Sequence, residues 1–175
     1  MKAARPLVVV LLVCALALAS ACGDRQPTAP QPPAPSADLI GSLLHATGLL
    51  SCSNLPYDST TQTIGPAGGS LSVGPHTLVI PRAALKQSVS ITMILPTGLR
   101  VNAVKFKPAG LQFQTPAALT MSYANCSLLG KLLPKRIAYK TDNLQILYYL
   151  LSLDNLLSKY VTGKVNHFSD YVIAW

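Results

Sequence analysis

Near the end of the chain, His167 and Ser169 stand on either side of Phe168. Alternate side chains of a strand project from the same face, so an imidazole and a hydroxyl at this spacing come within reach of each other. A base beside a hydroxyl is the arrangement that activates a serine as a nucleophile. The same spacing also gives an ordinary hydrogen bond within a closing strand, and we favour that structural role.

A second group of side chains with chemical potential is basic. Its members, the densest positive cluster of the chain, are Lys131, Lys135, Arg136 and Lys140. Such a cluster could attract an anionic surface or polymer. No aromatic side chains alternate with these residues, as they do where proteins stack single-stranded nucleic acid. The sequence therefore predicts a solvated basic edge, with anion binding as the weaker alternative and no nucleic-acid partner.

Cysteine is the third candidate. Two basic residues precede an apolar run over residues 7–18, and small residues then lead to Cys22. This order is that of a secretory signal, and the run is shorter than the ~20 residues of a membrane span. Cys22 in this setting resembles the lipobox cysteine of bacterial lipoproteins, where lipid is attached to the thiol and the leader is removed just before it. We predict a lipoprotein signal peptide over residues 1–21; the alternative is an ordinary signal peptide cut near Ala21.

Lipidation of Cys22 would hold the protein to the bacterial cell envelope. Gly23 rather than aspartate follows this cysteine, so the simple inner-membrane retention signal of some enteric bacteria is missing. This favours the outer membrane, on its periplasmic or surface face. The expected partners are therefore a membrane, reached through the lipid on Cys22, and an envelope protein or polymer.

The two cysteines that remain are Cys52 and Cys126. Cys14 lies in the leader and Cys22 is the lipid acceptor, so an exported compartment permits a disulfide between the other two. Two buried free thiols are the alternative. None of the three histidines has metal-ligand spacing with either cysteine, so we expect no metal and no cofactor.

Composition favours a turn-rich β protein. The chain has 14 prolines and 11 glycines, and all of its six acids are aspartate. Long amphipathic helices normally carry Glu–Lys pairs on their solvent face, so the lack of glutamate argues against a helical bundle. The shortage of acids also argues against a hydrolase that works with two carboxylates.

The region after Cys22 is expected to be a tether and then a helix. Residues 22–35 are rich in proline, alanine and glutamine, which favours a disordered linker with extended polyproline structure. Residues 36–59 are predicted to form a short helix, capped by Ser36, and a connecting segment. The apolar side chains at helical spacing are Leu39, Ile40, Leu43 and Leu44.

Residues 60–175 have the pattern of an all-β domain. Short apolar, β-branched runs alternate with turn residues. The clearest run alternates apolar and polar side chains, and its apolar members are Val89, Ile91, Met93 and Leu95. Residues 144–151 are apolar on both faces and are bounded by turn-like segments, including 152–155, so we predict a strand there. Strands that follow strands without helices predict an antiparallel β-sandwich.

Two stretches of this region resemble the opening of the ZU-five domain, the β-sandwich named for zonula occludens proteins and Unc-type netrin receptors. They are Gly68-Gly69-Ser70-Leu71 and residues 78–85, LVIPRAAL. The paired glycines permit a tight turn with positive φ. Ala83 departs from the pattern, because the family commonly has glycine there. The side chains expected to face the core are Leu71, Leu78 and Ile80.

The resemblance implies a domain that makes protein–protein contacts and supports its neighbours. In some ZU-five-containing proteins a His-Phe-Ser tripeptide is a self-cleavage site, where the serine attacks the carbonyl of the preceding residue and water hydrolyses the ester. This implies His167 as base, Ser169 as nucleophile and a cut after Phe168. We expect a non-enzymatic, lipid-anchored interaction or structural module, with self-cleavage or binding of envelope polyanions as alternatives.

Overall fold

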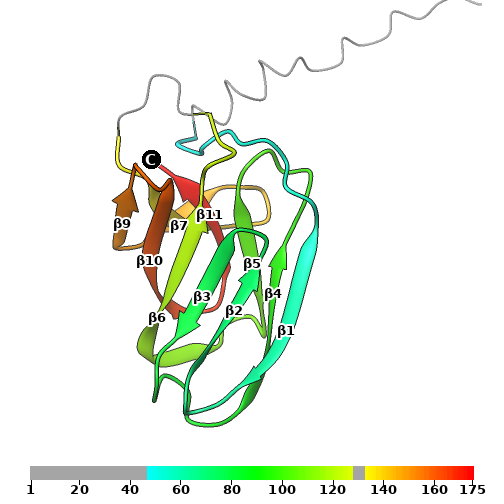
Figure 1. Ribbon diagram of the computed structural model, residues 1–175, viewed down its shortest axis with the longest axis vertical. Coiled ribbons are helices and arrows are strands. Elements are labelled where there is room, and N and C mark those ends of the chain that lie inside the picture. The colour runs from blue at the N-terminus through cyan, green and yellow to red at the C-terminus, as the bar shows by residue number, and fades with distance from the viewer. Residues whose placement is uncertain (1–46, 128–132) are drawn as a thin grey trace, which may run out of the picture. The chain divides into compact units, whose positions relative to one another are not determined.

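The computed structural model describes residues 47–127 and 133–175, and within these ranges it contains strands and no helix. The strands form two antiparallel sheets (Figure 1). The six-stranded sheet has the spatial order β1 (Asp58–Ile64), β4 (Val89–Leu95), β5 (Ala103–Lys107), β11 (Asp170–Ala174), β7 (Arg136–Lys140), β8 (Ile146–Tyr149). The five-stranded sheet has the order β2 (Gly69–Val73), β3 (His76–Ile80), β6 (Gln112–Ser122), β10 (Tyr160–His167), β9 (Ser152–Asn155).

This architecture confirms the prediction of an all-β fold built from two antiparallel sheets. The signal peptide, Cys22 and the tether fall on residues 1–35, and the helix was predicted from residue 36. These segments lie outside the described residues, apart from the end of the connecting segment. The first strand, β1, begins at Asp58, two residues before the expected start of the domain.

The core lies between the two sheets and is made by the alternation of each strand. In β4 the side chains of Ile91, Met93 and Leu95 are buried, while the residues between them are not. Val89, expected on the same face, is half-buried and packs against this core. Leu71, Leu78 and Ile80 of the other sheet are buried as predicted.

Consecutive strands close both sides of the sandwich. The edge strands β1 and β2 follow each other in the chain and are in contact at one side. The edge strands β8 and β9 follow each other at the other side, joined by Leu150 and Leu151. At this junction the Leu150 N–H donates to Ile137 O at 2.8 Å, and the Lys164 N–H donates to Leu151 O at 3.2 Å.

Two boundaries differ from the sequence prediction. The apolar runs at residues 111–113 and 117–123 predict two separate strands, but β6 runs through Pro116, where the pairing with β10 shifts register. Residues 152–155 were expected as a turn, yet they form β9 and pair with residues 160–163 of β10. Pairing with a neighbouring strand outweighed the local turn preference in both cases.

The glycine pair and Ala83 lie in the turns that connect β1 with β2 and follow β3. Gly68 has φ +81°, and a Cβ placed on it would lie 2.5 Å from Ile80 O. Ala83 has φ +60°, a left-handed conformation that costs a non-glycine residue about 1 kcal/mol. Ala84 and Leu85 follow as buried residues. The turn forms although alanine replaces the expected glycine.

The chain enters the domain across one end of the sandwich. Leu49 pairs with Ala174, and the Trp175 N–H donates to Gly48 O at 3.1 Å. From there the segment runs past Cys52 to the start of β1 on the opposite side (Figure 1). Residues 47–57 therefore span the end of the sandwich from the side of β8 to the side of β1.

Candidate functional site

The peptide bond predicted to be cut lies in the short connection between β10 and β11. Phe168 is buried, and its ring stacks on Phe106 with centroids 4.6 Å apart and meets Phe113 edge-on at 5.1 Å. Its backbone N–H donates to Leu111 O at 2.8 Å, and its carbonyl oxygen accepts from the Gly110 N–H at 3.0 Å. The carbonyl that a nucleophile would attack is thus polarised by one backbone donor.

The two side chains flanking Phe168 have different surroundings. The His167 ring packs edge-on against Tyr139, with the ring centroids 5.6 Å apart, and the Tyr171 hydroxyl donates to the backbone carbonyl of His167. Ser169 instead lines a cavity of about 660 Å³ with Phe168, Lys105, Lys140 and Asp170 among its walls. The hydrogen bonds of the described residues include none from the His167 imidazole to the Ser169 hydroxyl.

Several charged groups of this cavity pair with one another. Lys105 Nζ lies 2.9 Å from Asp170 Oδ2 and 3.1 Å from Asp142 Oδ1, and these hydrogen bonds raise the pKa of Lys105. The same contact lowers the pKa of Asp142. Lys140 Nζ lies 3.6 Å from Asp170 Oδ2, and burial lowers the pKa of this lysine. Lys107 also lines the cavity without an ion pair among the described residues, so three lysines face two aspartates there.

The predicted solvated basic edge is wrong for two of its four members. Lys135 is fully buried and its ammonium group donates to Leu133 O. Lys140 is 4% exposed and faces Asp170. Arg136 is exposed and lies over the Tyr149 ring at 4.3 Å, and Lys131 falls outside the described residues. Long aliphatic stems let these lysines join the sheet packing, which sequence clustering does not reveal.

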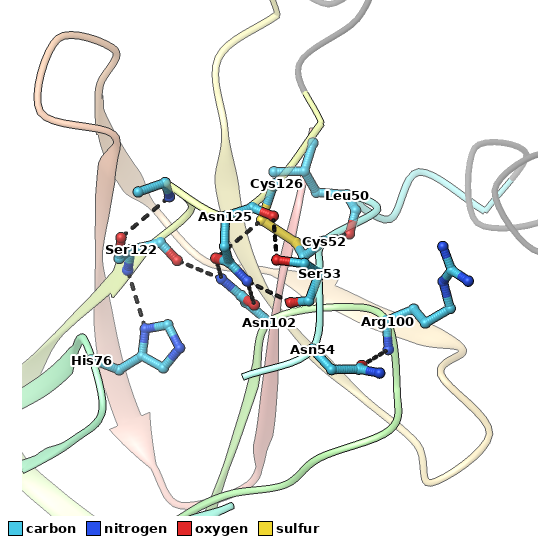
Figure 2. Close-up of a disulfide and its surroundings, with 11 residues drawn as sticks. Leu50, Cys52, Ser53, Asn54, His76, Arg100, Asn102, Ser122, Asn125 and Cys126 are labelled. Atoms are coloured by element: carbon cyan, nitrogen blue, oxygen red, sulfur yellow. Dashed lines mark hydrogen bonds between the residues drawn. A yellow bond between two sulfur atoms is a disulfide. The ribbon is translucent and has the colours of Figure 1, made fainter. Parts of the chain in front are cut away.

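Cys52 and Cys126 form a disulfide with an S–S distance of 2.07 Å, which confirms the predicted pair (Figure 2). Beside it the amides of Asn102 and Asn125 bond reciprocally, at 2.7 and 3.1 Å. The Asn102 amide also donates to Ser122 O, and the Asn125 amide donates to Ser53 O. The network ties the entry segment to the end of β6, and it has the character of a structural staple.

His76 lies below this network at the start of β3. Its Nδ1 accepts from the Ser122 N–H at 3.1 Å, as Figure 2 shows, while Nε2 is buried without a partner among the described residues. Burial lowers the pKa of His76 to about 4. The histidine is therefore neutral at physiological pH. Among the described residues no three His, Cys, Asp or Glu side chains gather in a way that could hold a metal ion.

The largest feature that sequence patterns missed is an apolar surface on the side of β8 and β9. Ten large apolar side chains are exposed in the described ranges, and seven of them come from residues 147–160. We call these seven the leucine edge: Leu147, Tyr148, Leu151, Leu153, Leu156, Leu157 and Tyr160. The sequence shows the apolar run over residues 144–151, but it does not show that side chains of this run are exposed.

Comparison with known proteins gives no relative. No protein-family model matches this chain, and no curated protein matches it. In the ranges that the structure describes, no helix is long and apolar enough to cross a membrane.

Proposed function

We propose that this protein is a lipid-anchored β-sandwich of the bacterial cell envelope that acts as a non-enzymatic interaction or structural module. The observation that carries the interaction role is the leucine edge, because a soluble domain rarely leaves so many large apolar side chains together in solvent. The Cys52–Cys126 disulfide supports an exported location, where thiols oxidise. Lipid on Cys22 supplies the anchor.

A ZU-five-like identity is part of the same proposal. Its support is the turn after β3, where Ala83 adopts the positive φ that explains a glycine preference. Gly68 provides the close approach to Ile80 O that the paired glycines were expected to permit. These are local features of about twenty residues, and the fold around them is a sandwich of two antiparallel sheets.

Mass spectrometry of protein extracted from the producing bacterium tests the anchor. The expected N-terminal peptide begins at Cys22 and carries lipid, and Cys22→Ser removes the lipid and the processing. Cys14→Ser is the matched control, since that cysteine lies in the leader and its loss leaves lipidation intact. An N-terminus elsewhere without lipid would overturn the proposed anchor.

Self-cleavage between Phe168 and Ser169 is the second candidate, favoured by the Gly110 N–H that donates to the Phe168 carbonyl. Ser169 Oγ would attack this carbonyl carbon while His167 takes the hydroxyl proton. The C–N bond then breaks, the proton passes to the new amine, and water hydrolyses the ester to a carboxylate and a free hydroxyl. Tyr139 holds the imidazole by ring packing, so the histidine must turn before it reaches the hydroxyl.

Intact mass of the folded protein separates the two candidates. Self-cleavage predicts two fragments, the smaller spanning residues 169–175, and one intact chain in Ser169→Ala. Ser158→Ala is a matched control, because this serine lies in the turn between β9 and β10, remote from the bond. A single mass covering both sides of the bond leaves the non-enzymatic module.

A further inference from the structure

The leucine edge is ordered, so its exposure is a property of the fold. β9 pairs with β10 over four residues, and the turn between them is held by Asn155 Oδ1, which accepts from the Ser158 N–H at 3.1 Å. Lys159 O accepts from the Tyr123 N–H at 2.9 Å. Leu157, at 98% exposure, stands at the tip of this turn. The backbone therefore holds the side chains outward in a fixed arrangement.

Charge around the leucine edge is positive. The segment 147–160 contains only Asp154 and Lys159 as charged residues. Asp154 turns inward, where its carboxylate accepts from the Tyr123 hydroxyl at 2.6 Å and from the Lys135 N–H at 2.8 Å. Lys159 is exposed beside the leucines. The surface thus combines leucines, tyrosines and a lysine without an outward acid, which is the pattern of residues that enter the interface of an anionic membrane.

The remaining acids of the described ranges are also bonded within the domain. Asp58 accepts from the backbone of Ser59 and Gly74, and Asp142 and Asp170 pair with Lys105. Ten lysines and arginines stand against four aspartates in residues 47–127 and 133–175. An anionic surface would therefore meet a positive domain in which the acids are already neutralised.

The position of the leucine edge agrees with an anchor at the start of the chain. A Cβ on Gly48 would lie 3.2 Å from the Tyr149 hydroxyl of β8, so the chain enters the domain beside this edge. Figure 1 shows the turn between β9 and β10 at the same end of the sandwich as the C-terminus, which bonds to Gly48. The described part of the chain therefore begins at the end of the sandwich where this turn lies.

We propose that the leucine edge seats in the surface of an anionic bilayer, with Leu156 and Leu157 entering the acyl boundary. Tyr160 lies at the headgroup level, where amphipathic rings are favoured, and Lys159 contacts lipid phosphate. The inference rests on the proposed envelope function and adds a second, protein-made contact with the membrane.

Tryptophan quenching by lipid tests this contact in the full-length protein. The chain is reconstituted in vesicles of phosphatidylethanolamine and phosphatidylglycerol at 3:1, with bromine on the acyl chains. Leu157→Trp adds a reporter at the turn, and the matched control Gln87→Trp adds one at an exposed site beyond β3, at the opposite end. The unmodified chain supplies the baseline of its own Trp175. Quenching at position 157 should be at least twofold stronger than at position 87.

Equal quenching at positions 157 and 87 overturns the inference. Crosslinking at position 157 to a second copy, or to residues 36–46 of the same chain, would also overturn it by assigning the edge another occupant. Lys159→Gln should reduce the quenching in these anionic vesicles and leave it unchanged in vesicles of phosphatidylcholine. The mass of the N-terminal peptide is read on the same sample, so a missing lipid on Cys22 is distinguished from a missing contact at the leucine edge.

Discussion

The two sides of the sandwich expose side chains of opposite polarity. On one side, the exposed residues of the edge strands β1 and β2 are mostly hydroxyl-bearing, and no large apolar side chain of either strand is exposed. We call this side the hydroxyl edge; its exposed hydroxyl-bearing residues are Ser59, Thr61, Thr63, Ser70 and Ser72. On the other side, β8, β9 and the turn beyond them carry the leucine edge.

This difference shows which edge residues the fold itself explains and which it does not. Edge strands invite pairing with other chains, and polar side chains are the usual protection. Hydroxyls at the first side also bond across strands, as Thr61 does with Thr92 at 2.9 Å. The fold is therefore compatible with a polar edge, and it gains nothing from leucines that stay in solvent. Their presence on one side only points to a contact made there.

Removing the disulfide should have the largest effect on the free energy of unfolding, because the Cys52–Cys126 bond fixes the segment that crosses from one side of the sandwich to the other. Cys52 and Cys126 are 74 residues apart, and closing a loop of this length contributes about 4 kcal/mol to the free energy of unfolding. The double variant Cys52→Ser and Cys126→Ser should lose this amount in denaturant unfolding. Reduced wild-type protein is the control and should lose a similar amount; a loss below about 1 kcal/mol would contradict the staple.

Acid should weaken the strands next to the hydroxyl edge through His76, which opens β3. Its pKa is about 4 in the folded protein against 6.5 in the unfolded chain, so the unfolded state binds more protons between these values. Stability is complete above pH 6.5 and falls as the pH drops towards 4, by roughly 2–3 kcal/mol at pH 4.5. Urea unfolding of wild type and His76→Gln at pH 7 and 4.5 measures this. Equal losses in both proteins would exclude the histidine as the cause.

Two turns near the hydroxyl edge should respond in opposite directions to a change between glycine and alanine. Ala83→Gly relieves a positive φ and should raise the free energy of unfolding by about 1 kcal/mol. Gly68→Ala is the counterpart and should lower it, because the added Cβ meets Ile80 O at 2.5 Å. Thermal unfolding of both variants gives the signs. A loss of stability in Ala83→Gly would contradict the strain at that turn.

Much of the fold could be predicted from local patterns. The alternation in β4 fixed its buried face, and elimination among the cysteines found the disulfide pair. What local patterns missed depends on tertiary partners. Residues 152–155 have turn composition, but pairing with β10 and the inward bonds of Asp154 make them β9. Lys135 and Lys140 had the pattern of surface charge. Local sequence does not show that the Lys135 ammonium group donates to Leu133 O, or that Lys140 faces Asp170 of β11.

The candidate sites also combine features that local sequence patterns specify with features that depend on tertiary partners. The His-Phe-Ser tripeptide around Phe168 does not specify the Gly110 donor or the Tyr139 ring, which come from other parts of the chain. The leucine edge was hidden for a different reason. Apolar runs normally predict burial, and only the strand order shows that β8 and β9 are both edges. A signal did exist, since residues 147–160 contain nine large apolar side chains, and the structure leaves seven of them exposed.

The smallest effect on stability is expected where the two sides differ most. Leu153 is 79% exposed in β9, so Leu153→Ser should change the free energy of unfolding by less than about 0.5 kcal/mol. Leu119→Ala in β6, fully buried, should lose about 2–5 kcal/mol in the same denaturant titration. If Leu153→Ser alone costs as much as the buried substitution, the leucine edge supports the fold itself. If it costs nothing and weakens attachment to anionic vesicles, the two sides differ because only one of them meets a partner.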